Sequence, residues 1–299
     1  MSLVVIGTLA YDTIETAHER REDVLGGSAT HFAVAACHQY SPRLVAVVGT
    51  DFRPEHLRAL EERGVDVEGV EVAEGDTFRW SGRYEADWNT RHTLETQLNV
   101  YEHFDPKLPE SYRDSDYVFL ANASPSVQMK GLSQVEAPAF VVADTMNLWI
   151  DIALEDLKQL LQRVDAIVMN DEEARMLTGE GNLIRAARRV LEMGPDYVIL
   201  KKGEHGAFVM GPDVHFSVPS YPVEEVVDPT GAGDSFAGGF MAYLARVGDH
   251  SPASLRQAML HGTVTASFCV QGFGIEPLVE AGAEDLAARA ADLLSIVTV

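Results

Sequence analysis

Short apolar runs alternate along this chain with stretches of helical periodicity. The runs consist mainly of Val, Ile, Leu, Phe and Ala, and they occupy residues 3–6, 44–48, 117–120, 140–143, 166–169 and 197–200. Uninterrupted apolar strands are typical of a sheet that is covered on both faces, whereas a strand with one wet face alternates apolar and polar residues. The pattern therefore predicts a doubly wound, three-layer α/β/α fold with a mainly parallel sheet.

Amphipathic patterns between these runs predict the helices. Four of them cover residues 29–37, 54–63, 150–163 and 183–193, and two more follow Pro252, around residues 255–270 and 283–294. A chain of 299 residues is long enough for one large domain with a small appendage.

One region departs from the alternation of strands and helices. In TFRWSGRY, residues 77–84, aromatic side chains alternate with polar ones, and Leu98 and Val100 continue this pattern in TQLNVY. A period of two predicts half-exposed strands. We expect a small second sheet from two inserted segments, about residues 10–24 and 74–104, within a single domain over residues 1–299.

The charge of the chain limits its partners. It has 46 acidic residues against 23 Lys and Arg, a net charge of −23, which repels nucleic acid and anionic membranes. The N-terminus, MSLVVIG, has no basic segment, and no apolar run approaches membrane-spanning length. Cys37 and Cys269 lie in apolar helical patterns, which predicts two buried thiols. We expect a cytoplasmic protein without nucleic-acid or membrane partners.

Residues 226–240, VVDPTGAGDSFAGGF, place several glycines where a helix begins. Such a turn directs backbone N–H groups toward one point, and the positive end of the helix dipole makes this point a phosphate cradle. Gly231, Ala232 and Gly233 supply the N–H groups, and Asp234 follows in the first helical turn. Alternatively, Asp234 only stabilises the helix dipole. The fingerprints GxxxxGK[ST] and GxGxxG do not occur, so a different type of phosphate site is required.

The sequence DPTGAGD followed by SFAGGF resembles the C-terminal signature of the ribokinase-like, or PfkB, family of carbohydrate and nucleoside kinases. The resemblance implies that Gly231, Ala232 and Gly233 form the anion hole, and that Asp234 accepts the proton of the substrate hydroxyl. N–H donors suit a loose phosphoryl-transfer transition state, whose charge is spread over three oxygens. The resemblance also implies ATP and Mg²⁺ as cofactors, and a monovalent cation such as K⁺ near Asp228.

Two further motifs match family positions on the nucleotide side. In MNDEEARML, Asn170 and Glu173 have the spacing of a helix capping box. The resemblance implies that Asn170 lies at the nucleotide and that Glu173 orients water around magnesium. In VILKKGEHGAFVM, Gly203 and Gly206 predict a hairpin-like turn. The resemblance places this turn along the nucleotide, with Lys201 near its phosphates.

A third motif, LGGSATHFAVAA, begins a helix after two glycines. The resemblance implies that Gly26 and Gly27 allow the substrate to approach the backbone closely, and that Asp12 in TLAYDTIET binds substrate hydroxyls. The usual family motif has Asn four residues after the second glycine, where this chain has His31. An imidazole offers different donors from an amide, so His31 is either a substrate contact or a satisfied buried histidine.

Together these motifs predict a kinase that transfers the γ-phosphoryl group of ATP to a hydroxymethyl group of a sugar or sugar-like substrate. A nucleoside kinase is the first alternative, with Phe78, Trp80, Trp88 or Tyr101 forming a flat slot for the base. A catalytically silent sugar- or nucleotide-binding relative is the second. We expect the small sheet to close over the substrate as a lid, and its exposed edges favour a homodimer.

Overall fold

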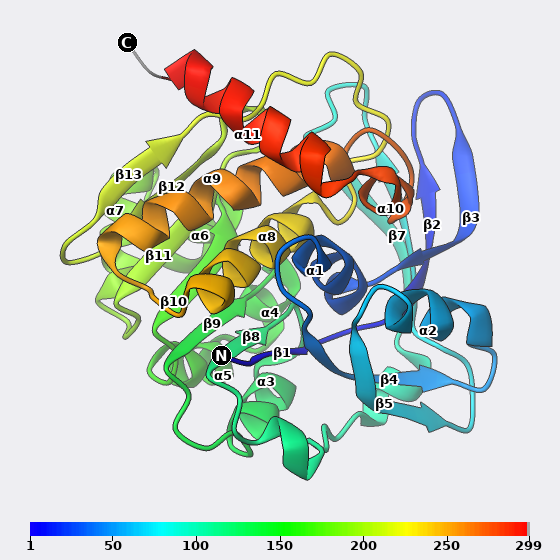
Figure 1. The fold of residues 1–299 in the computed structure, drawn as a ribbon. Helices are drawn as coiled ribbons and strands as arrows, with labels where there is room; N and C mark the ends of the chain where they lie inside the picture. The colour runs from blue at the N-terminus through cyan, green and yellow to red at the C-terminus, as the bar shows by residue number, and fades with distance from the viewer. Residues whose placement is uncertain (298–299) are drawn as a thin grey trace.

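The fold is given by a computed structural model, which describes residues 1–297. Its main sheet lies between two layers of helices (Figure 1). In sheet order the strands are β13 (His215–Val218), β12 (Ala207–Met210), β11 (Tyr197–Lys201), β10 (Ala166–Asn170), β9 (Phe140–Asp144), β8 (Tyr117–Leu120), β1 (Leu3–Ile6), β4 (Arg43–Gly49) and β5 (Asp66–Ala73). Strand β12 pairs antiparallel with both β11 and β13, and the other strand pairs described in this sheet are parallel. The predicted mainly parallel α/β sheet is confirmed.

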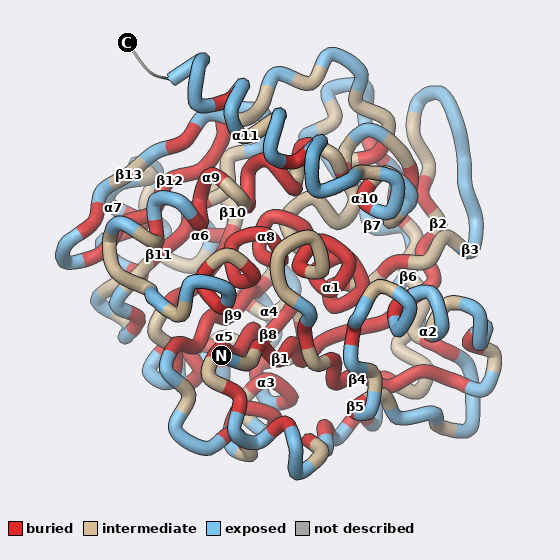
Figure 2. The backbone as a smooth tube through the Cα atoms, viewed as in Figure 1, coloured by how far each residue is buried: buried red, intermediate tan, exposed pale blue. Residues whose placement is uncertain are grey.

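The central strands are apolar throughout because both of their faces are covered. In β1, Leu3 and Val5 belong to one hydrophobic cluster and Val4 and Ile6 to the other, and all four side chains are fully buried. Figure 2 shows this buried backbone running through the middle of the molecule. The uninterrupted apolar runs therefore reflect two cores, one on each side of the sheet.

The helices form the two outer layers. One layer contains α1 (Ser28–Cys37), α2 (Pro54–Glu61), α8 (Ala232–Val247), α9 (Pro252–Cys269), α10 (Glu276–Glu280) and α11 (Ala283–Val297). The other contains α3 (Pro125–Leu132), α4 (Asn147–Ile152), α5 (Leu154–Leu161), α6 (Asp171–Thr178) and α7 (Leu183–Leu191). Helices α1 and α8 are buried over most of their length (Figure 2). The start of α8 lies beside the start of α1, because a Cβ on Gly231 would lie 2.3 Å from the ring of His31.

Two local predictions are wrong. The helix predicted over residues 150–163 is two helices, α4 and α5, which meet at Ala153 with φ −137° and ψ 33°. No glycine or proline marks this break, and the apolar periodicity continues across it. Leu98 and Val100 do not continue a strand: Asn99 has φ 50° and begins a 3₁₀ helix, Asn99–His103. Both apolar side chains turn toward the main core there.

A separate four-stranded sheet lies at one edge of the molecule, in the order β3 (Arg20–Gly26), β2 (Ala10–Glu15), β6 (Arg79–Tyr84) and β7 (Arg91–Gln97). Strands β2 and β6 pair in parallel, and the other two pairs are antiparallel. The predicted second sheet is therefore present.

The aromatic residues of this region divide between two cores. Phe78 and Tyr101 pack edge to face at 5.7 Å between ring centroids and belong to the main core. Trp80 and Trp88 instead pack around a small cluster under the second sheet that contains Tyr84. Phe78 and Tyr101 therefore attach the segment to the core, and the idea that they form a slot for a base is wrong.

Both cysteines have free thiols, as predicted, although Cys37 is only partly buried. Within residues 1–297, no helix is long and apolar enough to cross a membrane.

Candidate active site

The predicted nucleotide-side residues meet at the carboxyl ends of three neighbouring strands. Strands β9, β10 and β11 are parallel neighbours and end at Asp144, Asn170 and Lys201. The Nζ atom of Lys201 lies 3.5 Å from Oδ2 of Asp144. Open α/β sheets bind their ligands at this edge, because loops and helix N-termini gather there.

The glycine turn before α8 lies directly against this edge. Gly231 is the N-cap of α8, with φ 76° and ψ 0°, a left-handed conformation that favours glycine. A Cβ atom on Gly233 would lie 2.7 Å from Nζ of Lys201, so the turn and the lysine are in contact. The structure thus brings the predicted anion hole, Gly231, Ala232 and Gly233, next to a cation.

Asp234 follows this turn and is surrounded by other carboxylates. Desolvation and, second, the nearby charge of Asp144 raise its pKa to about 8, although Lys201 acts to lower it. For Lys201, burial opposes the charged form, but Asp144, Glu173 and Asp234 outweigh burial and raise its pKa. The lysine therefore stays charged, and the site holds more acids than cations.

The predicted capping box at the start of α6 is present. The backbone N–H of Glu173 donates to Oδ1 of Asn170 at 2.7 Å, and the N–H of Asn170 donates to Oε2 of Glu173 at 2.7 Å. Burial raises the pKa of Glu173 to about 7. Neighbouring buried carboxylates with a single lysine fit a divalent cation. Among the described residues, no three side chains converge to hold a metal by themselves, so phosphates and water would complete its coordination.

The hairpin that follows Lys201 also forms as predicted, with β11 and β12 antiparallel. Both glycines of its turn have positive φ, 53° at Gly203 and 77° at Gly206. A Cβ on Gly206 would lie 2.1 Å from the carbonyl oxygen of Val218. Close backbone packing therefore explains Gly206 by itself, and contact of this turn with a nucleotide stays a prediction.

The predicted substrate-side residues lie where β2 meets the start of α1. Asp12 is 5% exposed, and a Cβ on Gly26 would lie 1.9 Å from its Oδ2. Gly27 has φ 95°, and its backbone N–H acts to lower the pKa of the Asp12 carboxyl. Burial and the charge of Asp228 outweigh this effect and raise the pKa to about 7. Both glycines are thus required by this packing, whatever their contact with a substrate.

His31 lies behind the anion hole. It is 1% exposed, and a Cβ on Gly231 would lie 2.3 Å from its ring. Its Nδ1 is 3.9 Å from Sγ of Cys269, and its Nε2 has no hydrogen-bond partner within the described chain. Burial lowers its pKa to about 4, so the ring is neutral. The structure therefore places His31 against the anion hole, and it is not a fully satisfied buried histidine.

Asp228, three residues before Gly231, is fully buried. Its Oδ1 accepts the N–H of Thr230 at 2.8 Å, whereas Oδ2 has no partner among residues 1–297. Burial raises the pKa of Asp228 to about 6, and backbone N–H groups of Thr230 and Gly274 lower it. A buried carboxylate oxygen without a partner fits a monovalent cation at this position.

Three further residues lie at this site and were not predicted from the sequence. Asp144 directly follows the apolar run 140–143. Its position at the carboxyl end of a predicted strand could have indicated a residue of the ligand-binding edge. Tyr84 approaches the glycine turn, with its Oη 3.2 Å from Oγ1 of Thr230. Arg91, on β7, lowers the pKa values of both Glu173 and Asp234. Nothing in the local sequence distinguishes Tyr84 or Arg91 from other residues of half-exposed strands.

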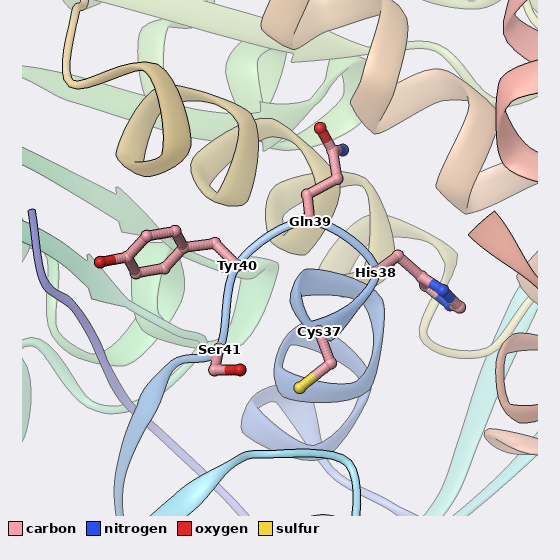
Figure 3. Close-up of a pocket in the computed structure, with 5 residues that line it drawn as sticks. All are labelled: Cys37, His38, Gln39, Tyr40 and Ser41. Atoms are coloured by element: carbon pink, nitrogen blue, oxygen red, sulfur yellow. The ribbon is translucent and has the colours of Figure 1, made fainter.

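A hollow elsewhere on the surface does not belong to this site. It measures about 420 Å³, lies at the C-terminal end of α1 and is lined by residues 37–41. Their side chains point in different directions rather than toward one point (Figure 3). None of the predicted site residues lines it.

The chain matches the model of the pfkB family carbohydrate kinases over residues 1–281. It is 32% identical over 251 residues to a cytidine kinase from Thermococcus kodakarensis, covering 82% of this chain and 89% of that one. It is 26% identical to a nucleoside kinase from Methanothermobacter thermautotrophicus, covering 92% and 91% of the two chains.

Solved structures share the fold at lower identity. The nucleoside kinase of Methanocaldococcus jannaschii superposes with a TM-score of 0.78 at 21% identity, covering 98% of this chain and 99% of that one. A ribokinase from E. coli in complex with ATP and Mg²⁺ superposes with a TM-score of 0.80 at 19% identity, covering 97% and 99%. The chain belongs to the pfkB family of carbohydrate kinases, and it is a phosphotransferase with an alcohol group as acceptor.

Proposed function

We propose that this protein transfers the γ-phosphoryl group of ATP to a hydroxymethyl group of a nucleoside. The observation that carries the proposal is the contact of the glycine turn with Lys201, whose charge acts on Asp234, in a chain 32% identical to a cytidine kinase over 89% of that enzyme. By contrast, the match to the deoxyribokinase of Salmonella typhimurium covers only 37% of that enzyme. The relatives thus favour the nucleoside alternative over a simple sugar.

Asp234 is the proposed base. In its ionised form it orients the acceptor hydroxyl and takes its proton late, as the bond to phosphorus forms. The backbone N–H groups of Gly231, Ala232 and Gly233 stabilise the phosphoryl oxygens, and Lys201 adds a fixed positive charge.

Magnesium, when bound, would neutralise the phosphate charge, and Glu173 would hold it through water. Asn170 and the turn from Gly203 to Gly206 would lie along the nucleotide. A monovalent cation would neutralise the unpartnered Oδ2 of Asp228.

On the acceptor side, Asp12 is the proposed ligand of the ribose hydroxyls, with His31, Gly26 and Gly27 around it. Trp80 pairs with Asp12 across β2 and β6. The outer edge of its ring lies against Gly82, where a Cβ would approach within 2.0 Å. A flat aromatic face beside a hydroxyl-binding carboxylate suits a nucleoside, because the base can stack while the ribose is held.

The proposal includes three statements about organisation. The two inserted segments act as a lid on one domain, and the free thiols fit a cytoplasmic location. The outer strands β3 and β7 leave two sheet edges unpaired, which favours a homodimer through the lid. Sedimentation that shows only a 32.7 kDa species at micromolar concentration would count against the dimer.

The test is ADP release with ATP and Mg²⁺ against a panel of nucleosides, pentoses, hexoses and polyols. We expect the highest kcat/KM for a nucleoside. A preference for a free pentose or hexose would support the sugar kinase, the second candidate, which the 34% identity to the deoxyribokinase over 119 residues favours.

A further inference from the structure

The residues assigned to the site so far include more carboxylates than cations. Asp144, Glu173 and Asp234 surround a single lysine, whose Nζ is already 3.5 Å from Asp144. A nucleoside triphosphate adds further negative charge at this place. A second cation near the point of transfer would therefore have a large effect, since charge interactions are strong where water is excluded.

Arg91 lies on the face of the small sheet that is turned toward the site. It is directly opposite Tyr84 in the antiparallel pair of β6 and β7, and opposed residues project on the same side of a sheet. Tyr84 is buried, and its Oη lies 3.2 Å from Oγ1 of Thr230, next to the anion-hole glycine. The pairing therefore places the exposed Arg91 on the same side of the sheet as Tyr84, which is the side that faces the glycine turn.

Arg91 differs from the other arginines of the small sheet because it has no ion-pair partner among the residues that the structure describes. Each of the other four pairs with a carboxylate: Arg20 with Glu22, Arg21 with Glu19, Arg79 with Asp23 and Asp51, and Arg83 with Glu15. Within residues 1–297, no carboxylate oxygen lies within 4.0 Å of Arg91. Its guanidinium instead lies 5.7 Å from the ring centroid of Trp80.

The charge of Arg91 nevertheless acts on the site. It lowers the pKa values of Asp234 and Glu173, although burial dominates both shifts. The turn of the same hairpin also reaches the nucleotide side, since a Cβ on Gly203 would lie 2.8 Å from Oδ1 of Asn89. The β6–β7 hairpin thus spans the site from the glycine turn to the turn after Lys201.

Resting on the proposed phosphoryl transfer, we propose that Arg91 is a catalytic residue that binds the transferring phosphoryl group. Its guanidinium donates hydrogen bonds to the phosphoryl oxygens, stabilises their charge in the transition state and forms no covalent bond. The small sheet then does more than cover the acceptor, because it supplies a second cation in addition to Lys201 of the main sheet.

The test compares Arg91→Met with Arg91→Lys in the full-length protein. Met keeps the packing on Trp80 without the charge, and Lys keeps the charge without the planar fork. We expect kcat to fall about 100-fold for Arg91→Met and less for Arg91→Lys, with the KM of the acceptor changed less than about threefold. Arg83→Met is the matched control, because Arg83 lies on the same sheet in an ion pair with Glu15, and it should keep kcat.

Chemical rescue separates catalysis from structure. Millimolar guanidinium should raise kcat of Arg91→Ala and leave Asp234→Asn unchanged. If wild-type protein is active but Arg91→Met keeps its kcat, the role of Arg91 is wrong and the proposed function stands. Equal losses in Arg91→Met and Arg83→Met, without rescue, would also overturn it. If the wild type phosphorylates no compound of the panel, the proposed function fails, and the role of Arg91 fails with it.

Discussion

Asp234 should give the reaction a characteristic pH dependence. Desolvation and the nearby Asp144 raise its pKa to about 8, so the carboxyl group is largely protonated at neutral pH in the free protein. A protonated acid cannot accept the hydroxyl proton. We expect kcat/KM for the acceptor to rise about tenfold per pH unit up to about pH 8 and then level off. A profile that is flat from about pH 6 to about pH 9, measured with saturating ATP, would contradict this role.

At this scale, sequence reasoning found the residues that lie in short, ordered motifs. Asp234 and Glu173 lie in the first turns of helices α8 and α6, and Lys201 ends strand β11. Their motifs are local in sequence, and the structure brings them together. Arg91 was not predictable, because its direction depends on cross-strand pairing with Tyr84. A register shift between Ser81 and Gly82 alters that pairing, and the local sequence gives no sign of it. The direct contact between His31 and Gly231 likewise arises only from the packing of α1 against α8.

Helix α6 combines a structural and a proposed catalytic role in one side chain, and one substitution separates them. Gln at position 173 can still accept the N–H of Asn170, so Glu173→Gln should keep the capping box and the Tm. It removes the charge that would orient water around magnesium. We expect kcat to fall at least about tenfold and the Mg²⁺ concentration for half-maximal rate to rise.

Asn170→Ala tests how much the capping box contributes to the stability of the protein. It removes the N-cap acceptor and should cost about 1 kcal/mol of unfolding free energy. An unchanged Mg²⁺ dependence in Glu173→Gln, together with a lower Tm, would show that Glu173 serves only the cap.

Whole elements were predictable where one periodicity extends over the complete element. The strands from β8 to β11 follow the apolar runs closely, because burial on both faces leaves a continuous signal. The break at Ala153 and the 3₁₀ helix after Leu98 carry no such signal. In the second case, the side-chain amide of Asn99 donates to the carbonyl oxygen of Thr77 at 2.9 Å, a contact set by tertiary structure.

For the whole molecule, the arrangement of two cores around one sheet follows from sequence, but the position of the small sheet does not. That sheet depends on parallel pairing of β2 with β6, which are more than sixty residues apart in the chain. This pairing brings Asp12, Trp80 and Arg91 to the same edge as the glycine turn. The site is therefore a property of the assembled molecule, although its individual motifs are local.

The most direct test of the central claim is the formation of phosphorylated cytidine from ATP, Mg²⁺ and cytidine, followed by ³¹P NMR for the wild type and Asp234→Asn. We expect a nucleoside monophosphate with the wild type. For the variant we expect a rate about 1,000-fold lower, with the fold and ATP binding retained. Equal rates would remove Asp234 as the base. Confirmed binding of ATP without product from cytidine or any other nucleoside would contradict the proposed nucleoside kinase.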